Sequence, residues 1–148
     1  MNKTFKLLTA LILSVLFLLG LSTGCGKKNP SAQREFSKLE LVDGVYTGEY
    51  SDQDDEHPST YKVEITIENG KITACTGAEY DENGNEKGDE YAAINDAAAK
   101  AVAGIRQYPE LLVAAQDPEK IDAISGATLS YNRFKEAVWQ ALDKAVKK

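Results

Sequence analysis

The sequence has few residues that bind metals or form disulfides. Its 148 residues include two cysteines, Cys25 and Cys75, and a single histidine, His57. No Cys-x-x-Cys or Cys-x-x-Cys-His pattern is present, so structural zinc, iron–sulfur clusters and c-type haem lack their usual ligands. The acidic loop near Asp81 fails the spacing of a calcium loop, because Glu86 stands where that loop requires glycine. We therefore expect no metal, and any redox chemistry would need an organic cofactor.

Basic residues are also in deficit. The chain has 17 Lys and Arg against 23 Asp and Glu, which gives a formal net charge of −6 at pH 7. An acidic surface is repelled by the phosphates of nucleic acids and by anionic lipid headgroups. The composition therefore argues against nucleic acid as a partner.

Long apolar runs are confined to the N-terminus. Lys3 and Lys6 precede an almost unbroken apolar run over residues 7–21, and Cys25 follows three small residues. A positive start, a short apolar core and small residues before a cleavage site are typical of a secretory signal. The position of the cysteine resembles that in bacterial lipoprotein signals, where it is lipidated and becomes the mature N-terminus. We predict a lipoprotein signal over residues 1–24 and a lipid anchor on the extracytoplasmic face of the cell membrane. The alternative is an uncleaved membrane anchor, for which the run is short.

The remainder of the chain divides into a tether and one small domain. Residues 25–38 are rich in Lys, Asn, Ser and Gln and are typical of a linker. Residues 39–148 have a length that suits a single domain. With Cys25 lipidated, Cys75 would have no partner for a disulfide within the chain.

The first half of the domain has the periodicity of strands. Residues 61–68 alternate apolar and polar side chains, and Asn69-Gly70 is the preferred two-residue hairpin turn. Residues 71–78 form the predicted returning strand, and residues 45–50 a further short strand.

The turn also predicts the register of the hairpin. A two-residue turn pairs the flanking residues symmetrically, which places Ile65 opposite Ala74 and Cys75 opposite Glu64. Cys75 would then lie on the polar face of the sheet.

The second half has the periodicity of helices. From about residue 90 one apolar face recurs every three to four residues, and a short separate helix is predicted from Pro109 to about Ala115. The last helix is predicted over residues 131–146. The expected apolar faces consist of Ile94, Ala98, Ala101, Val102 and Ile105, and of Tyr131, Phe134, Val138, Ala141, Leu142 and Ala145. The order of elements predicts an α+β fold in which a small, hairpin-rich antiparallel sheet packs with C-terminal helices.

A segment of small and hydroxylic residues precedes the last helix. Asp122 begins the run Asp-Ala-Ile-Ser-Gly-Ala-Thr-Leu-Ser, which ends at Ser130. Small side chains let a ligand approach the backbone, and a helix N-terminus suits a phosphate. Judged by itself, Thr128 is better explained as a helix N-cap, a role that Ser130 could also fill.

The pattern Asp-x-x-Ser-Gly-Ala-Thr resembles the flavinylation motif of the FMN-binding domain family. That family includes the C subunit of the sodium-pumping NADH:quinone reductase and the G subunit of the Rnf complex. The resemblance extends along the chain to residues 43–48, to the hairpin at residues 63–73, to residues 116–118 and to a helix like residues 134–141. It identifies residues 39–148 as an FMN-binding domain.

The resemblance implies a covalent cofactor and an enzyme that attaches it. In the family, FMN is esterified through its phosphate to the threonine that ends the motif, here Thr128. An ApbE-type flavin transferase makes the ester, with FAD as donor. Asp122 is implied either as a contact for the transferase or as a structural acceptor in the loop, and Ser125 as a hydrogen-bond partner of backbone or phosphate. The predicted FMN-binding residues are Thr128, Ser125, Gly126, Ala127, Asp122, Leu129 and Ser130.

The residues around the flavin ring are less well defined by the sequence. Tyr80, Tyr91 and Tyr131 could stack on it, although each is equally well explained as an ordinary core or surface tyrosine. Lys87 could stabilise an anionic reduced ring, with a solvated loop lysine as the alternative. The Glu-Thr loop of the electron-transport subunits is absent, and the loop at residues 80–91 resembles that of small, stand-alone lipoprotein members.

These features predict a membrane-anchored, extracytoplasmic flavoprotein that transfers electrons and does not convert a substrate. Its redox donor and acceptor are not identified by the sequence, and no catalytic residue is predicted. Two alternatives remain open: a non-redox surface lipoprotein that acts as a binding module, and a protein that binds FMN reversibly.

Overall fold

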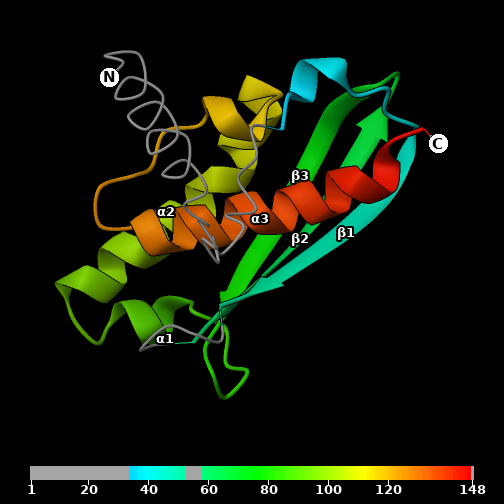
Figure 1. Ribbon diagram of the computed structural model, residues 1–148. Coiled ribbons are helices and arrows are strands. Elements are labelled where there is room, and N and C mark those ends of the chain that lie inside the picture. The colour runs from blue at the N-terminus through cyan, green and yellow to red at the C-terminus, as the bar shows by residue number, and fades with distance from the viewer. Residues whose placement is uncertain (1–33, 53–57, 148) are drawn as a thin grey trace, which may run out of the picture. The chain divides into compact units, whose positions relative to one another are not determined.

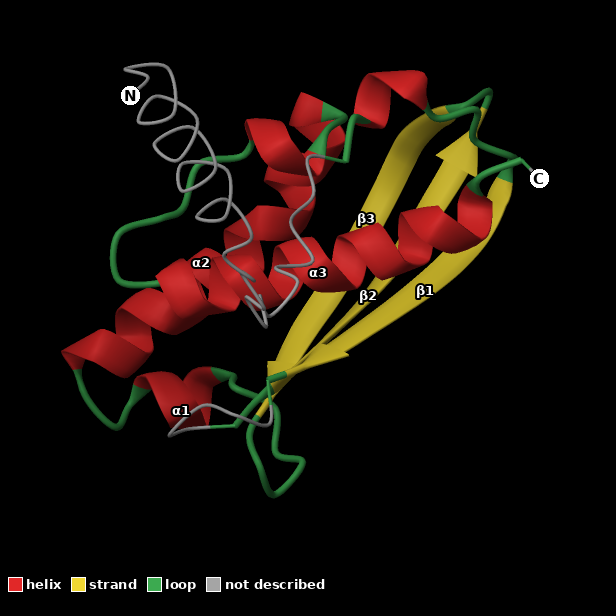
Figure 2. Ribbon diagram, in the orientation of Figure 1, coloured by secondary structure: helices red, strands yellow, loops and turns green. Residues whose placement is uncertain are grey.

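The computed structural model describes residues 34–52 and 58–147, and Figures 1 and 2 show their course. The elements are η1 (Phe36–Lys38), β1 (Gly44–Ser51), β2 (Thr60–Glu68), β3 (Lys71–Tyr80), α1 (Asp89–Ala92), α2 (Asp96–Ala115), η2 (Pro118–Lys120) and α3 (Thr128–Ala145). The strands form one antiparallel sheet in the order β1-β2-β3, and α2 and α3 pack against it. The predicted α+β class is confirmed.

The hairpin between β2 and β3 turns at Asn69-Gly70 as predicted, but its register shifts farther along. A β-bulge near Thr66 gives β3 an extra residue, so Ile65 pairs with Cys75. The predicted pairings of Ile65 with Ala74 and of Cys75 with Glu64 are therefore wrong. The extra residue also reverses the alternation, and Cys75 packs against the core instead of lying on the polar face.

The same bulge turns Glu79 toward the helices. Glu79 pairs with Tyr61, whose side chain is fully buried, and directly paired residues of an antiparallel sheet share a face. The carboxylate of Glu79 is accordingly 0 % exposed. An ionisable side chain is thereby brought into the interior at the end of β3.

The hydrophobic core lies between the sheet and the two long helices. The contributing side chains are those of Tyr61, Val63, Ile65, Ile67 and Ile72 from the sheet, and of Phe134, Ala137, Val138, Ala141, Leu142 and Ala145 from α3. The predicted apolar face of the last helix is confirmed, with Tyr131 partly buried. Helix α3 crosses β1 so closely that a Cβ atom on Gly48 would lie 1.8 Å from the carbonyl oxygen of Ala137. Only glycine fits at that crossing.

Helix α2 runs without a break through Pro109. The prediction of a separate short helix from Pro109 is therefore wrong. Proline has no N–H to donate to the carbonyl of Ile105, four residues earlier. The hydroxyl of Tyr61 donates to that carbonyl over 3.1 Å instead. The sheet supplies the hydrogen bond that the proline removes.

The helical region before α2 is interrupted, which corrects one predicted core residue. Helix α1 ends at Ala92, and α2 begins after Asn95, whose side chain accepts a hydrogen bond from the N–H of Ala98. Ile94 lies between them and is 66 % exposed, so it does not belong to the buried face. The side chains of Ala98, Val102 and Ile105 are buried as predicted.

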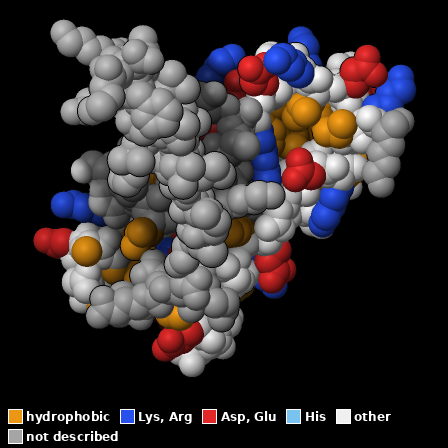
Figure 3. All heavy atoms as spheres, in the orientation of Figure 1, with side chains coloured by type: hydrophobic (Ala, Val, Ile, Leu, Met, Phe, Trp, Pro, Cys, Tyr) orange, Lys and Arg blue, Asp and Glu red, His pale blue; other side chains and the backbone are white. Residues whose placement is uncertain are grey.

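The first and last parts of the described domain are hydrogen-bonded to each other. Leu41 forms an antiparallel bridge with Val146, and the N–H of Lys147 donates to the carbonyl of Glu40 over 2.9 Å. On the visible face of the domain, acidic and basic side chains lie interspersed (Figure 3).

The predictions about the N-terminus concern residues that the structure does not describe. The signal over residues 1–24, the lipidation of Cys25, and residues 25–33 of the tether lie outside the described ranges, as does His57. Within residues 34–52 and 58–147, no helix has the length and apolar character needed to span a bilayer.

Candidate functional site

The motif residues form a tight turn that leads directly into α3. The N–H of Ala127 donates to the carbonyl of Ile124 over 2.9 Å, with Ser125 and Gly126 as the central residues. Gly126 has a φ of 84°, a value that favours glycine at the third position of a type II turn. A side chain at Gly126 would also meet Lys100, whose Cβ atom would lie 2.9 Å from the added Cβ. The glycine of the motif is therefore required by the turn itself.

Helix α3 begins at Thr128, three residues earlier than predicted. Its N-cap is Ala127, which has no side chain that could cap it, so the predicted capping roles of Thr128 and Ser130 are both wrong. The carbonyl of Ala127 accepts from the N–H of Tyr131 over 2.9 Å and so opens the helical hydrogen-bond pattern. Thr128 is exposed at the first helical position, where backbone N–H groups lack intrahelical partners.

Two tyrosines, the buried Tyr108 and the partly buried Tyr131, hold the motif loop in place. The hydroxyl of Tyr108 donates to the carbonyl of Ala127 over 3.0 Å and accepts from the N–H of Ile124 over 3.1 Å. The hydroxyl of Tyr131 donates to the carbonyl of Ile121 over 2.7 Å. Burial raises the pKa of both phenols above the ordinary value, so both remain hydrogen-bond donors at neutral pH. Tyr131 thus has a structural contact at its hydroxyl.

The small size of Ala127 is explained by packing. Ala127 is buried, and a Cβ atom on Gly104 of α2 would lie 2.3 Å from the Cβ of Ala127. Two small residues therefore let the motif loop lie directly on α2. This contact fixes the start of α3 and with it the position of Thr128.

A pocket of about 340 Å³ opens beside Thr128. The residues that line it are Lys87, Tyr91, Ala101, Gly126, Ala127, Thr128, Leu129, Ser130 and Arg133. Among the predicted ring contacts, Tyr91 and Lys87 lie here, whereas Tyr80 lines a different hollow and Tyr131 is engaged in the loop.

The two other polar residues of the motif point elsewhere. Asp122 and Ser125 are exposed and do not line the pocket beside Thr128. Within the described residues the carboxylate of Asp122 accepts no hydrogen bond, so nothing there supports its predicted alternative role as a structural acceptor.

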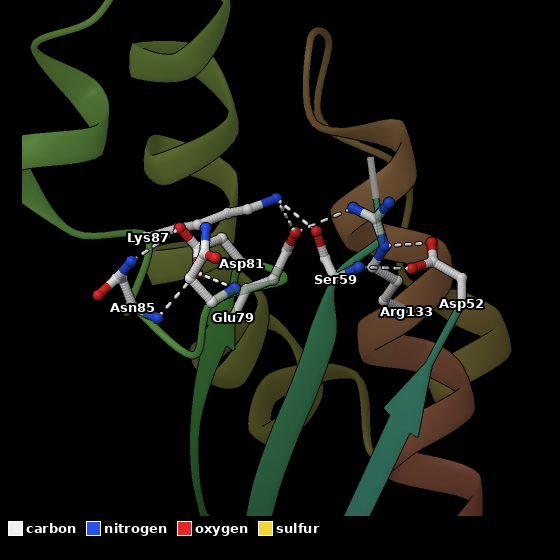
Figure 4. A network of polar contacts seen from close by, with 8 residues as sticks. Asp52, Ser59, Glu79, Asp81, Asn85, Lys87 and Arg133 are labelled. Carbon is white, nitrogen blue, oxygen red and sulfur yellow. Dashed lines mark hydrogen bonds and ion pairs between the residues drawn. The ribbon is translucent and has the colours of Figure 1, made fainter. Parts of the chain in front are cut away.

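A buried network of charged and polar side chains adjoins the pocket (Figure 4), and two of its members, Lys87 and Arg133, line it. One oxygen of Glu79, Oε1, accepts from Lys87 Nζ over 2.7 Å and from Arg133 over 2.9 Å. Lys87 Nζ also donates to the hydroxyl of Ser59 over 2.8 Å, and Arg133 Nε donates to a carboxylate oxygen of Asp52. The network joins the end of β1, the start of β2, the end of β3, the loop after it and α3.

The positive and negative side chains of this network are not equally close to the pocket. Lys87 and Arg133 line the pocket, whereas Glu79 and Asp52, the carboxylates with which they pair among the described residues, do not. The second oxygen of Glu79, Oε2, is buried and has no hydrogen-bond partner within the described part of the chain. The pocket beside Thr128 therefore has two cations in its wall, an arrangement that suits an anionic ligand.

A larger hollow of about 590 Å³ lies along the face of the sheet opposite the core. It is lined by polar and small side chains from all three strands, among them Lys62 and Tyr80, and by Lys144. None of the motif residues borders it. The smaller pocket is the better site because it joins the motif, the start of α3 and the buried cations.

The described residues contain no group of His, Cys, Asp and Glu side chains that is arranged to hold a metal ion. The chemistry available at the pocket is instead that of the Thr128 hydroxyl, the backbone N–H groups of the first turn of α3, and the two cations.

Sequence reasoning missed Tyr108, Arg133 and Glu79. Arg133 had a signal, because it falls between Ser130 and Ala137 on the inward face of the helix, where a charged residue is exceptional. Glu79 had none, because only the β-bulge turns it inward. Tyr108 follows the helical period of Ile105 and Leu112, but its contacts with the motif loop depend on the tertiary structure.

Comparison with known proteins gives one family and two solved structures. The model of the FMN-binding domain family matches residues 57–143, which include the buried network from Ser59 onward and the motif. A crystal structure of a protein from Clostridium perfringens is 29 % identical, with a TM-score of 0.59, and the match covers 71 % of this chain and 88 % of that one. A solution structure from Clostridium thermocellum is 26 % identical, with a TM-score of 0.42, over 72 % and 94 % of the two chains. The search of curated proteins gives no match.

Proposed function

Because this chain belongs to the FMN-binding domain family, it is a flavin-binding protein, and we propose that it carries FMN covalently on Thr128 and acts in electron transfer. The observation that carries the proposal is the position of Thr128. Its hydroxyl is exposed at the uncapped start of α3, in the wall of a pocket that also contains Lys87 and Arg133.

The residues around Thr128 fit the phosphate of FMN. The first turn of α3 offers backbone N–H groups and the positive end of the helix dipole, both of which favour an anion. Gly126 supplies the positive φ that the turn requires and lines the same pocket. Thr128 would carry the ester, and the first turn of α3 would solvate its charged oxygens.

The remainder of the pocket fits a planar ring. Tyr91 and Ala101 supply apolar surface in the same wall, and Leu129 is 57 % exposed next to Thr128. Bound FMN supplies a ring system that accepts and returns electrons. The protein would hold that ring beside Tyr91 and close to solvent, where a redox partner can reach it.

The proposal includes a transferase as partner. Asp122 and Ser125 are exposed on the outside of the motif turn, so an ApbE-type flavin transferase could contact them while FAD donates the FMN unit to Thr128. We assign Asp122 to that contact.

The first experiment is co-expression of the chain with a flavin transferase, followed by denaturation. We expect an intact mass increased by one FMN less water, flavin fluorescence that stays with the denatured protein, and modification within residues 122–133. Thr128→Ala should abolish the modification, whereas Thr76→Ala, which removes an exposed threonine hydroxyl outside the motif and its pocket, should retain it. Covalent flavin on the Thr128→Ala protein would refute the assigned residue.

The same experiment separates the alternatives. Flavin that leaves the protein on denaturation would indicate reversible FMN binding in place of an ester. A colourless, unmodified protein from cells with active transferase would favour a non-redox binding module.

The location is a separate part of the proposal. We propose that residues 1–24 are removed and that lipid on Cys25 holds the domain at the extracytoplasmic face of the cell membrane. A covalent cofactor suits that location, because FMN that dissociated there would be lost to the medium. Wild-type protein should fractionate with membranes and incorporate labelled fatty acid, whereas Cys25→Ala should not incorporate the label. Equal labelling of the two proteins would contradict lipidation at this cysteine.

A further inference from the structure

Lys87 is held at the pocket beside Thr128 by two buried partners. Its side chain is 8 % exposed, and its ammonium donates to Glu79 Oε1 over 2.7 Å and to the Ser59 hydroxyl over 2.8 Å. Neither partner lines the pocket. Burying a lysine costs side-chain conformational entropy, and these two hydrogen bonds offset that cost. They thereby fix the position of the ammonium charge.

The ammonium retains one N–H for a ligand. An ammonium has three donors, and the described residues supply two acceptors, Glu79 and Ser59. The remaining side of the ammonium faces Tyr91, with Nζ 5.1 Å from the ring centroid. Tyr91 is the aromatic side chain in the wall of the pocket. The third donor of Lys87 therefore lies at the aromatic part of the pocket.

Arg133 prevents Glu79 from cancelling the charge of Lys87. Glu79 Oε1 is shared between Lys87 and Arg133, and Arg133 is paired in addition with Asp52. Two cations thus line the pocket, while both carboxylates stand behind them. The network presents its positive side to the pocket.

We propose that Lys87 is the charged contact of the flavin ring and that Glu79 and Ser59 are the residues that position it. The proposal rests on the proposed function, because it assumes that the ring lies in this pocket. Reduction by two electrons and one proton leaves the ring with one negative charge, which Lys87 would face. Lys87 would therefore stabilise the reduced flavin more than the oxidised flavin and raise the reduction potential.

The test compares reduction potentials of flavin-loaded full-length variants. Dithionite serves as the reductant, with a reference dye in equilibrium. We expect Lys87→Met to lower the ratio of reduced to oxidised flavin at least tenfold at a fixed potential, which corresponds to about 30 mV for a two-electron couple. Lys87→Arg keeps the positive charge and should therefore lower the reduction potential by less than Lys87→Met does. Glu79→Gln should change the reduction potential by less than Lys87→Met does, and it should leave the amount of covalent flavin unaltered.

Lys62 provides a matched control. Its Nζ lies 5.4 Å from the ring centroid of Tyr80, so it makes the same kind of contact on the opposite face of the sheet, away from the motif. Lys62→Met removes the same charge and should leave the potential unchanged.

A second variant tests whether a change in potential results from destabilisation of the domain by Lys87→Met. Lys87→Met leaves Glu79 with one cation fewer, which could destabilise the domain. The double variant Glu79→Gln/Lys87→Met removes one charge of each sign and so leaves the net charge of the network unchanged. Folding is checked by circular dichroism and thermal unfolding, and the double variant should show the same lowered potential.

Three other results would overturn the inference. A normal potential with less covalent flavin in Lys87→Met would mean that the lysine binds the phosphate. A normal potential with normal flavin content would mean that the buried pair is only structural. Wild-type protein without any flavin would instead refute the proposed function, and the inference with it.

Discussion

The hydroxyl of Tyr61 in β2 donates to the carbonyl of Ile105 in α2 over 3.1 Å. In a helix this carbonyl would accept from the N–H of residue 109, but residue 109 is a proline and has no N–H. Both side chains are buried, and the residues lie 44 positions apart in the sequence. A proline in a helix interior ordinarily kinks or ends the helix. Here a tertiary contact replaces the missing partner, and the helix continues for six residues beyond Pro109 to Ala115.

Tyr61→Phe should therefore destabilise the domain by about 1–3 kcal/mol, because it leaves a buried carbonyl without a donor. In the double variant with Pro109→Ala, the new N–H at residue 109 can bond to Ile105, so the cost of Tyr61→Phe should fall by about 1 kcal/mol. Urea unfolding of the four proteins of this cycle measures the coupling. Tyr46→Phe, which removes an exposed hydrogen bond to the carbonyl of Val42, serves as the control and should cost far less. Strictly additive costs would show that the hydroxyl does not compensate for the proline.

Gly104→Ala should disturb the flavin site through packing alone. The added Cβ atom would lie 2.3 Å from the Cβ of Ala127, so either α2 or the motif loop must move. We expect a loss of about 1–3 kcal/mol in the free energy of unfolding and a lower yield of covalent flavin. Gly88→Ala is the control, since its Cβ atom would meet nothing within 4 Å. Wild-type flavin content in Gly104→Ala would show that the transferase tolerates a displaced loop.

Tyr108→Phe should loosen the motif loop without changing the motif. The substitution removes the donor to the carbonyl of Ala127 and the acceptor for the N–H of Ile124. The expected cost is about 1–3 kcal/mol, and flavinylation by the transferase should slow because Thr128 is less firmly positioned. Time courses of in-gel fluorescence measure the rate, with Thr128→Ser as a comparison that keeps the loop contacts. An unchanged rate would assign Tyr108 to stability alone.

Stability should decline at alkaline pH because of Cys75. Burial raises the pKa of this thiol to about 12, against about 9 for a free thiol. A raised pKa in the folded state stabilises the protein below pH 9, and that contribution is lost as the pH rises from 9 toward 12. The loss between pH 7.5 and 10.5 should be about 2 kcal/mol from Cys75, with a further loss from Tyr61, whose pKa is also raised by burial. Urea midpoints at the two pH values should differ less for Cys75→Ala than for the wild type. If the urea midpoint changes equally with pH in Cys75→Ala and in the wild type, the thiol ionises as readily in the folded protein as in the unfolded one.

Much of the fold could be predicted because its signals are local. The hairpin at Asn69-Gly70 and the apolar face of α3 follow from periodicities of two and of three to four residues. The β-bulge near Thr66 has no such signal, since it depends on how β3 meets the core. The continuity of α2 through Pro109 depends on Tyr61, far away in the sequence, so local propensity predicted a break that tertiary structure removes.

The candidate site was predictable only where a motif marks it. The segment from Asp122 to Thr128 could be recognised from its residues, and the structure shows why Gly126 and Ala127 must be small. The wall of the pocket could not be recognised in the same way. Lys87, Glu79 and Arg133 come from a loop, a strand and a helix, and a strand bulge is needed to bring Glu79 inward.

The bridge between Leu41 and Val146 means that the two ends of the domain leave it side by side. A short linker could therefore join the segment after Val146 to the segment before Leu41, and the chain could be opened at the exposed hairpin turn of Asn69-Gly70 instead. Such a circular permutant would keep every contact of the flavin pocket, and its new ends would leave the domain at the same end of the sheet as the old ones, because the N–H of Gly70 donates to the carboxylate of Asp43 over 3.1 Å. The point of attachment lies at the Asn69-Gly70 end of β2 and β3, whereas Ser59 and Glu79, which bind Lys87 of the pocket wall, lie at the other end. A segment that precedes Leu41 therefore holds the domain by the end of the sheet that is remote from the flavin pocket.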